Sequence, residues 1–75
     1  MTLDDEEFFL EIGHRLRERR DELGWTQAGL ARRCELHKAY IGFVERGERN
    51  VSLLNLRRIA KALRIRLSDL FKGLA

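Results

Sequence analysis

Along most of the chain, apolar residues recur at spacings of three, four and seven, which is the period of an amphipathic helix. This pattern predicts a first helix over residues 3–23, capped by Thr2 and ended by Gly24. The acidic residues that follow Thr2 suit the positive end of the helix dipole. A second helix is predicted over residues 26–34, with Thr26 as its N-cap.

Two further helices are predicted in the C-terminal third. Ser52 can cap a segment whose apolar stripe runs from Leu53 to Leu63. A last short helix fits residues 67–73, with Gly73 as its stop and with three residues pointing inward, namely Leu67, Leu70 and Phe71.

The segment "AYIGFVERG", residues 39–47, has local preferences of a strand rather than of a helix. Gly42 within it costs a helix interior about 1 kcal/mol relative to alanine. A lone strand among helices would leave its backbone amides unpaired, however, so the helical context should override local propensity. We therefore predict a third helix over residues 37–45.

Two short helices, residues 26–34 and 37–45, separated by two residues form a helix-turn-helix arrangement, with the small Ala31 where they cross. In this arrangement the first helix rests on the DNA backbone and the second enters the major groove. The predicted fold class is all-α, a compact five-helix domain over residues 1–75 with the helix-turn-helix motif at residues 26–45.

The composition and the charge distribution limit the cellular location and the kinds of binding partner to be expected. The chain has 75 residues, no proline and one cysteine, Cys34, so it has no disulfide framework and a cytoplasmic location is expected. Five acids and no basic residue lie in the first eleven positions, whereas from Ile12 onward 15 basic and 7 acidic residues leave a balance of +8. Such a basic body suggests nucleic acid first and an acidic membrane surface second, and a solvated basic surface is the bland alternative. No apolar run is long enough for a membrane span.

Longer stretches of the chain resemble a known family. "TQAGLARRCELHKAYIGFVERGERN", followed by "SLLNLRRIAKAL", resembles the helix-turn-helix family of phage repressors and Cro, with its lambda-repressor-like DNA-binding fold, over roughly residues 12–71. Within that family, "YIGFVERGERNVSLLNL" is most similar to the controller proteins of restriction–modification systems. The resemblance implies a small dimeric transcription regulator that binds double-stranded DNA operators ahead of its own gene and the restriction gene.

The resemblance also implies roles for individual residues. Gln27 matches the phosphate-contacting glutamine at the start of the first motif helix, in agreement with the affinity of helix N-termini for phosphate. A lysine at the start of the recognition helix can donate to guanine, and an alanine methyl can touch a thymine methyl. The DNA-binding residues expected on this basis are Gln27, His37, Lys38, Ala39, Tyr40, Gly42, Phe43, Arg46, Arg49 and Asn50. Arg20 and Glu45 match the family's buried ion pair between the first helix and the recognition helix.

Several of these residues have alternative structural roles. Lys38 could be only a solvated charge, Tyr40 a core residue with its hydroxyl outward, and Phe43 a hydrophobic plug. The Arg20–Glu45 pair could be a surface contact of little energetic worth. Cys34 fits a buried small hydrophobe. No metal site is expected, because only Cys34 and His37 are close in sequence and nothing completes a set of four ligands with His14.

The sequence departs from the family pattern in three places. Glu35 stands at the turn position that usually holds glycine, so it must accept an unfavourable conformation. His37 stands at the recognition helix's N-cap, where serine or threonine is usual, which predicts a poor cap. Val51 replaces a frequent proline, a change associated with the controller subgroup.

The C-terminal third, residues 52–73, has more apolar residues than one small core needs, which predicts an isologous dimer interface; internal packing of all of them is the alternative. The expected interface residues are Val51, Leu54, Leu67, Leu70 and Phe71. Two-fold pairing would place half-sites about 34 Å apart on DNA. The controller resemblance implies activation when one dimer recruits RNA polymerase and repression when a second dimer blocks it.

Other function classes remain as alternatives. A phage-type repressor, or an antitoxin-like regulator whose main partner is another protein, fits the same motif. An enzyme is not expected, because the chain has no Ser/His/Asp set, carboxylate pair or phosphate loop. No cofactor, small-molecule ligand or membrane partner is expected.

Overall fold

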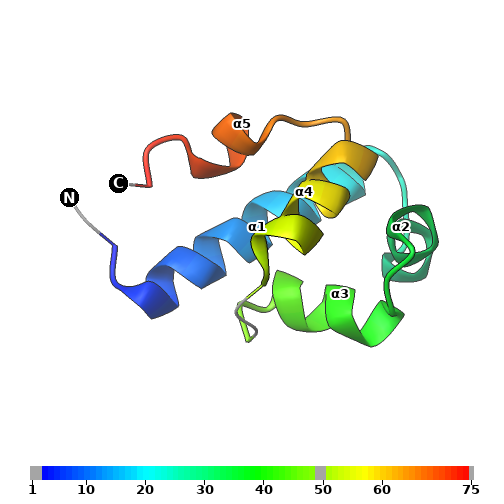
Figure 1. The fold of residues 1–75 in the computed structure, drawn as a ribbon, viewed down its shortest axis with the longest axis horizontal. Helices are drawn as coiled ribbons and strands as arrows, with labels where there is room; N and C mark the ends of the chain where they lie inside the picture. The colour runs from blue at the N-terminus through cyan, green and yellow to red at the C-terminus, as the bar shows by residue number, and fades with distance from the viewer. Residues whose placement is uncertain (1–2, 49–50, 75) are drawn as a thin grey trace.

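The computed structural model describes residues 3–48 and 51–74. Within these residues it contains five α-helices and no strand, so the predicted all-α class is confirmed (Figure 1). The helices are α1 (Asp5–Glu22), α2 (Gln27–Cys34), α3 (Lys38–Glu45), α4 (Leu53–Ala62) and α5 (Leu67–Phe71). The long α1 runs through the middle of the molecule, with α2 and α3 on one side of it and α5 on the other (Figure 1). None of the described helices is both long and apolar enough to cross a membrane.

The start of α1 differs from the expectation. Thr2, the predicted cap, lies outside the described residues, and Asp4 is the N-cap. Its carboxylate accepts a hydrogen bond from the Glu7 amide at 2.8 Å, and the Glu7 side chain accepts one from the Asp4 amide at 3.3 Å. This reciprocal pair is a capping box, which satisfies two helix-end donors at once. The predicted caps of the next helices are confirmed: Thr26 accepts from Gly29 at 3.0 Å and Ser52 from Asn55 at 3.1 Å.

The turn between α2 and α3 explains how two departures from the family pattern are tolerated. Glu35 adopts the left-handed conformation, with φ 57° and ψ 39°, as the turn requires. The following amide, of Leu36, donates to the Ala31 carbonyl at 3.0 Å and closes the end of α2. The predicted weakness of the α3 cap is wrong, because His37 Nδ1 accepts a hydrogen bond from the Ala39 amide at 3.2 Å.

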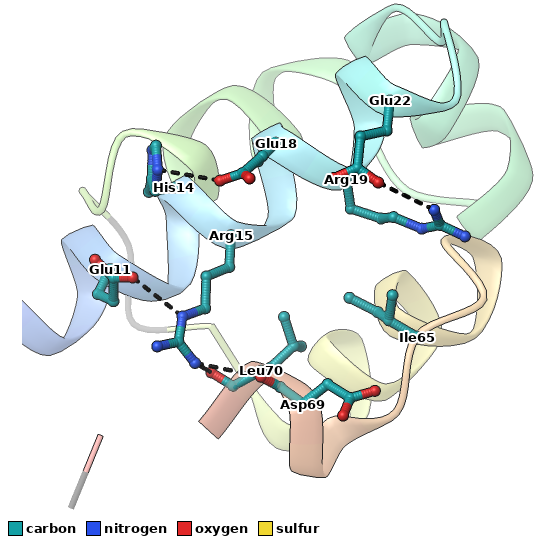
Figure 2. A pocket seen from close by; sticks show the side chains of 9 residues that line it. All are labelled: Glu11, His14, Arg15, Glu18, Arg19, Glu22, Ile65, Asp69 and Leu70. Carbon is teal, nitrogen blue, oxygen red and sulfur yellow. Dashed lines mark hydrogen bonds and ion pairs between the residues drawn. The ribbon is translucent and has the colours of Figure 1, made fainter. Parts of the chain in front are cut away.

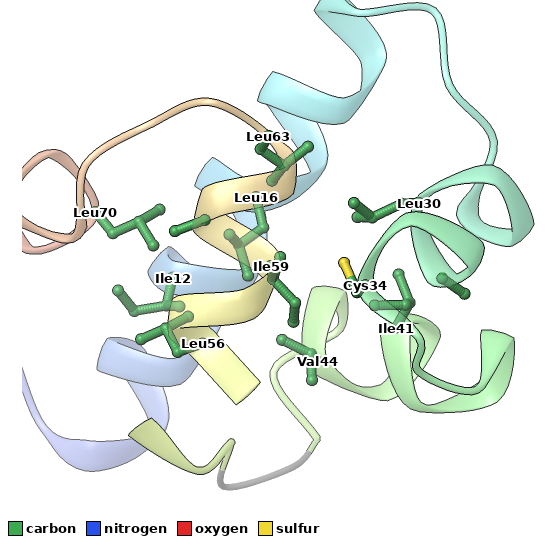
Figure 3. Packing of buried hydrophobic residues seen from close by; sticks show 12 residues of the cluster. Ile12, Leu16, Leu30, Cys34, Ile41, Val44, Leu56, Ile59, Leu63 and Leu70 are labelled. Carbon is green, nitrogen blue, oxygen red and sulfur yellow. The ribbon is translucent and has the colours of Figure 1, made fainter. Parts of the chain in front are cut away.

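The core gathers the inward faces of all five helices (Figure 3). Its most deeply buried large side chains, each less than 2% exposed, are Leu16, Leu30, Ile41, Ile59, Leu63 and Leu70. Burying each such side chain contributes about 1.5–3 kcal/mol. Cys34 is 5% exposed and belongs to the same cluster, as expected. Leu70 was predicted to lie in a dimer interface; at 1% exposure it is a core residue instead, because α5 turns it toward the other helices.

Two arginines of α1 donate hydrogen bonds to backbone carbonyls of the C-terminal part of the chain, and Figure 2 shows those of Arg15. Arg15 Nη1 donates to three carbonyl oxygens at the end of α5, at 2.8–3.2 Å, and its Nε donates to the Glu11 carboxylate at 3.0 Å. Arg19 Nε donates to the Leu63 carbonyl, at the end of α4, at 2.9 Å. These carbonyls have no partner inside their own helices, so the two cations complete the helix ends.

The last helix is shorter than predicted. It ends at Phe71, and Gly73 follows with φ 79°, in the left-handed region that suits glycine. Phe71 was expected to point inward, but it is 36% exposed and stacks on Phe8 of α1, with ring centroids 6.1 Å apart. A five-residue helix cannot bury every apolar side chain, so this ring stays at the surface.

Candidate nucleic-acid interface

A shallow surface groove lies where the start of α2 meets the outer face of α3. Seven of the ten DNA-binding residues expected from the sequence line it, namely Gln27, His37, Lys38, Ala39, Gly42, Phe43 and Arg46. They come together because positions 38, 39, 42, 43 and 46 share one side of a helix, and the tight turn brings Gln27 beside them. These seven residues, which were matched to the family by their positions in the sequence, therefore lie together in the structure.

The entrance of the groove is exposed and cationic. His37, Lys38 and Ala39 are all exposed at the first turn of α3. Lys38 forms no ion pair with any described residue, so its ammonium group is available to an external acceptor. A lysine and an exposed methyl group at the end of a helix are suited to the acceptor atoms and thymine methyls of the major groove.

At the far end of the groove, the Arg46 side chain is held by contacts with its neighbours. The Arg46 guanidinium carbon lies 5.2 Å from the centroid of the Phe43 ring, within cation–π range. Its Nε donates to the Glu48 carboxylate at 2.9 Å. The Arg46 side chain is still 54% exposed, so its remaining donors can reach a phosphate.

Of the other three expected DNA contacts, one lies outside the groove and two fall outside the described residues. Tyr40 is half-buried and is not part of the groove, because its hydroxyl accepts a hydrogen bond from Asn55 Nδ2 of α4 at 3.3 Å. A DNA contact through the remaining exposed edge of Tyr40 stays a prediction. Arg49 and Asn50 lie outside the described residues.

Arg20 and Glu45 pair across α1 and α3 beneath the groove. Arg20 Nε and Nη2 donate to the two Glu45 carboxylate oxygens at 2.7 and 3.0 Å, a bidentate geometry. Their side chains are 10% and 3% exposed, so this is a buried pair and not the surface contact considered as the alternative. The hydrogen bond to Glu45 raises the pKa of Arg20 above its ordinary value, which keeps the guanidinium charged.

The same carboxylate also reaches the groove, a contact that the sequence pattern did not indicate. Gln27 Nε2 donates to Glu45 Oε1 at 3.1 Å, and Arg20 Nη1 donates to the Trp25 carbonyl at 2.7 Å. The pair therefore ties α1, α3 and the start of α2 together. The family resemblance indicated the Arg20–Glu45 pair but not the bond from Gln27, which lies 18 residues from Glu45 along the chain.

The structure gives a reason for a glycine at position 42 that the sequence did not suggest. It is buried, and a Cβ at this position would lie 3.1 Å from Arg46 Nη1 and 3.6 Å from Gln27 Oε1. The missing side chain thus leaves room for two neighbouring side chains of the groove. Whether it also allows close approach to DNA stays a prediction.

No group of three metal-ligating side chains comes together among residues 3–48 and 51–74. Cys34 is buried, and that burial raises the pKa of its thiol. A buried, protonated thiol is a weak ligand and a weak nucleophile. Cys34 does not line the groove, whose side chains offer hydrogen-bond donors, charge and apolar contact.

Two short helices joined by a tight turn, the second presenting an exposed cationic groove, define a helix-turn-helix module. A family model described as helix-turn-helix matches residues 16–70, and the chain belongs to that family. The control protein C.BamHI of Bacillus amyloliquefaciens is 44% identical over 62 residues, covering 81% of this chain and 76% of that protein.

Solved structures of controller proteins are also similar to this chain in fold and sequence. The restriction–modification controller protein C.AhdI from Aeromonas hydrophila matches with a TM-score of 0.81 and 46% identity, over 84% of this chain and 96% of that one. The controller protein C.Esp1396I, solved as a tetramer with its natural 35-base-pair operator, matches with a TM-score of 0.79 and 30% identity, over 89% and 88%. The predicted resemblance to controller proteins is confirmed.

Proposed function

We propose that this chain is a dimeric, sequence-specific DNA-binding transcription regulator of the restriction–modification controller type. The observation that carries the proposal is the groove, in which the start of α2 and the outer face of α3 place Gln27, Lys38, Ala39, Phe43 and Arg46 side by side. The operator-bound structure of C.Esp1396I supports it by similarity.

In this proposal α3 lies in the major groove and reads bases with its first turn. Lys38 donates to guanine O6 or N7, and Ala39 and Phe43 contact thymine methyls. Gln27, at the first residue of α2, contacts a phosphate, where the helix dipole favours negative charge. Arg46 contacts the backbone beyond the bases that are read.

Dimerisation is supported by apolar side chains left at the surface. Leu53 is 70% exposed, Leu54 54% and Phe71 36%. Leu53, Phe71 and Val51 also line one apolar hollow between α1, α4 and α5. Exposed apolar groups gathered on one side of a small domain are typical of an interface. The interface that we propose is centred on Leu53, Leu54 and Phe71; Val51 and the half-buried Leu67, which packs against the core, lie closer to the interior.

In this proposal the protein acts in the cytoplasm, where the number of dimers bound to the operator sets the level of transcription. One bound dimer would recruit RNA polymerase and activate transcription, and a second dimer on an adjacent site would block it. The solved operator complex of C.Esp1396I is a tetramer, which is consistent with two dimers on one operator region for that protein.

Selection of bound duplexes from a random pool, followed by fluorescence anisotropy on the selected and a scrambled duplex, tests the function. We expect the selected site to be an inverted repeat with half-sites about one helical turn apart. We also expect binding at least about a thousandfold tighter than to the scrambled duplex at physiological salt. Equal affinity for both duplexes would rule out sequence reading. In that event, an antitoxin-like role with a protein partner would be the better account of the same fold.

A further inference from the structure

A second hollow lies at the C-terminal end of α2. Its walls come from the last turn of α2 and from the outer face of α4, which packs against α2. The residues that line it are Arg33, Cys34, Glu35, Arg58, Lys61 and Ala62. It thus joins two segments that are more than twenty residues apart in the sequence.

Three cations and a single carboxylate surround this hollow. Arg58 and Lys61 are exposed and have no hydrogen-bond or ion-pair partner among the described residues. The Arg33 guanidinium is held in place: its carbon lies 3.9 Å from the centroid of the Trp25 ring, and its Nη1 donates to the Gly29 carbonyl at 3.1 Å. Only Glu35 opposes them, so the rim carries a net positive charge.

The cations of α1 are arranged differently. Arg15, Arg17, Arg19 and Arg20 each pair with a carboxylate within 4 Å. Among the described residues, the arginines and lysines without an ion-pair partner therefore lie outside α1. Like charges placed together without counter-charges raise the local potential, which attracts a polyanion.

The chemistry of the hollow favours a charged polymer over a protein partner. Its apolar members offer no anchor, because Cys34 is 5% exposed and Ala62 is half-buried. Protein interfaces usually centre on a buried aromatic or aliphatic anchor. A single small anion would gain little from exposed cations, whereas a chain of phosphates gains from the release of its counterions.

We propose that this hollow is a second DNA-backbone contact, in which Arg33, Arg58 and Lys61 bind phosphates of the operator duplex outside the half-site read by α3. This inference rests on the proposed function. Glu35, in the lining of the hollow, precedes His37, in the lining of the groove, by only two residues, so the hollow lies just beyond the turn that leads into α3. Once α3 is seated, flanking phosphates are present at high effective concentration, but the duplex must curve toward the end of α2 to reach the hollow.

The test compares two duplexes, one that ends at the outer edges of the selected half-sites and one that extends about ten base pairs on each side. For the natural sequence, we expect severalfold tighter binding to the longer duplex at about 50 mM salt, and a salt slope steeper by roughly 1 to 2. Arg58→Gln/Lys61→Gln should bind both duplexes alike while keeping its affinity for the short one within about twofold. Flanks rich in flexible TA steps should favour the contact over stiff A-tracts.

The matched control is Arg17→Gln/Lys72→Gln, which removes the same charge from residues outside both the groove and the hollow. It should keep the length dependence of the natural sequence. Equal affinity of the natural sequence for the two duplexes would overturn the inference, and so would a length dependence that survives in Arg58→Gln/Lys61→Gln or is lost in the control. Bridging of two separate duplexes without any length dependence would also overturn it. Loss of discrimination on the short duplex, by contrast, would count against the proposed function itself.

Discussion

Gly13 of α1 lies directly against the backbone of Glu45 in α3. A Cβ built on Gly13 would lie 2.8 Å from the Glu45 carbonyl carbon and closer still to the carbonyl oxygens of Val44 and Glu45. Backbone atoms cannot move aside as a flexible side chain can. The absence of a side chain at Gly13 therefore sets how closely α1 and α3 approach. Arg20, seven residues further on the same face of α1, then reaches the Glu45 carboxylate.

Gly13→Ala should therefore destabilise the protein, although alanine is ordinarily the better helix former by about 1 kcal/mol. We expect the free energy of unfolding to fall by about 1–3 kcal/mol, because the added methyl group overpacks a fixed backbone contact. Urea denaturation monitored by circular dichroism measures the change. His14→Ala, at the neighbouring exposed position, should stay within about 0.5 kcal/mol of the natural sequence. A gain in stability for Gly13→Ala would contradict the close approach.

Removing one member of the buried ion pair should be costly. Arg20→Met leaves the Glu45 carboxylate buried with only Gln27 as a donor, and should lower the free energy of unfolding by about 3–5 kcal/mol. Replacing both residues, as Arg20→Met/Glu45→Leu, should cost less than the sum of the single changes, because no charge is then left buried. A double-mutant cycle by urea denaturation measures this coupling. Additive single effects would show that the pair contributes no coupling.

Lys38 and Gln27 should differ in how they affect DNA binding. Lys38→Ala should weaken the selected operator by about 1–3 kcal/mol and relax specificity at one base position. Gln27→Ala should weaken operator and scrambled duplexes alike, because a phosphate contact carries no sequence information. Anisotropy titrations on the operator and its single-base variants separate the two effects. If Lys38→Ala weakened binding to all duplexes by the same factor, Lys38 would contact the DNA backbone rather than a base.

Gly42→Ala separates folding from binding within α3. The added methyl group would meet Arg46 Nη1 at 3.1 Å, the far end of a flexible side chain, so stability should change by less than about 1 kcal/mol. Operator affinity should fall, because Arg46 and Gln27 must both move from their places in the groove. Anisotropy and urea denaturation on the same sample give both quantities. Unchanged affinity with improved stability would show that the glycine has no role in binding.

Leu53→Gln/Leu54→Gln should dissociate the proposed dimer. Both side chains are more than half exposed, so the change should cost the single folded domain little. Sedimentation velocity at micromolar concentration should then show a monomer, and operator affinity should fall because the two half-sites bind separately. Leu10→Gln, at a residue 49% exposed outside the apolar hollow, serves as the control and should remain dimeric. A dimer that persists in the double variant would place the interface elsewhere.

Much of the fold was predictable from the sequence because its signals are local. Thr26 and Ser52 mark the starts of α2 and α4 through side-chain-to-amide bonds that span only three residues. The segment containing Tyr40, Ile41 and Phe43 has strand preferences, yet it forms α3 because its neighbours are helical. Five of the expected DNA-binding residues, at positions 38, 39, 42, 43 and 46, lie in one groove because helical periodicity places them on one face.

The places where prediction failed depend on contacts between distant segments or on geometry within a cap. Leu70 is buried and Leu53 is exposed, although either leucine fits an amphipathic stripe. The cap by His37 Nδ1 requires a particular side-chain orientation that residue type does not specify. The link from Gln27 to Glu45 and the hollow beside Arg58 and Lys61 likewise arise only when separate helices meet.

By itself, the sequence determined the helical class, the order of the helices and the face of α3 that carries the groove, because periodicity and caps act over a few residues. Only the tertiary structure decided which surplus apolar residues reach the surface, how closely α1 approaches α3 at Gly13, and that Arg20 and Glu45 form a buried pair. Those properties depend on the distances between helices, and such distances are set by the packing of the whole domain rather than by any local stretch of chain.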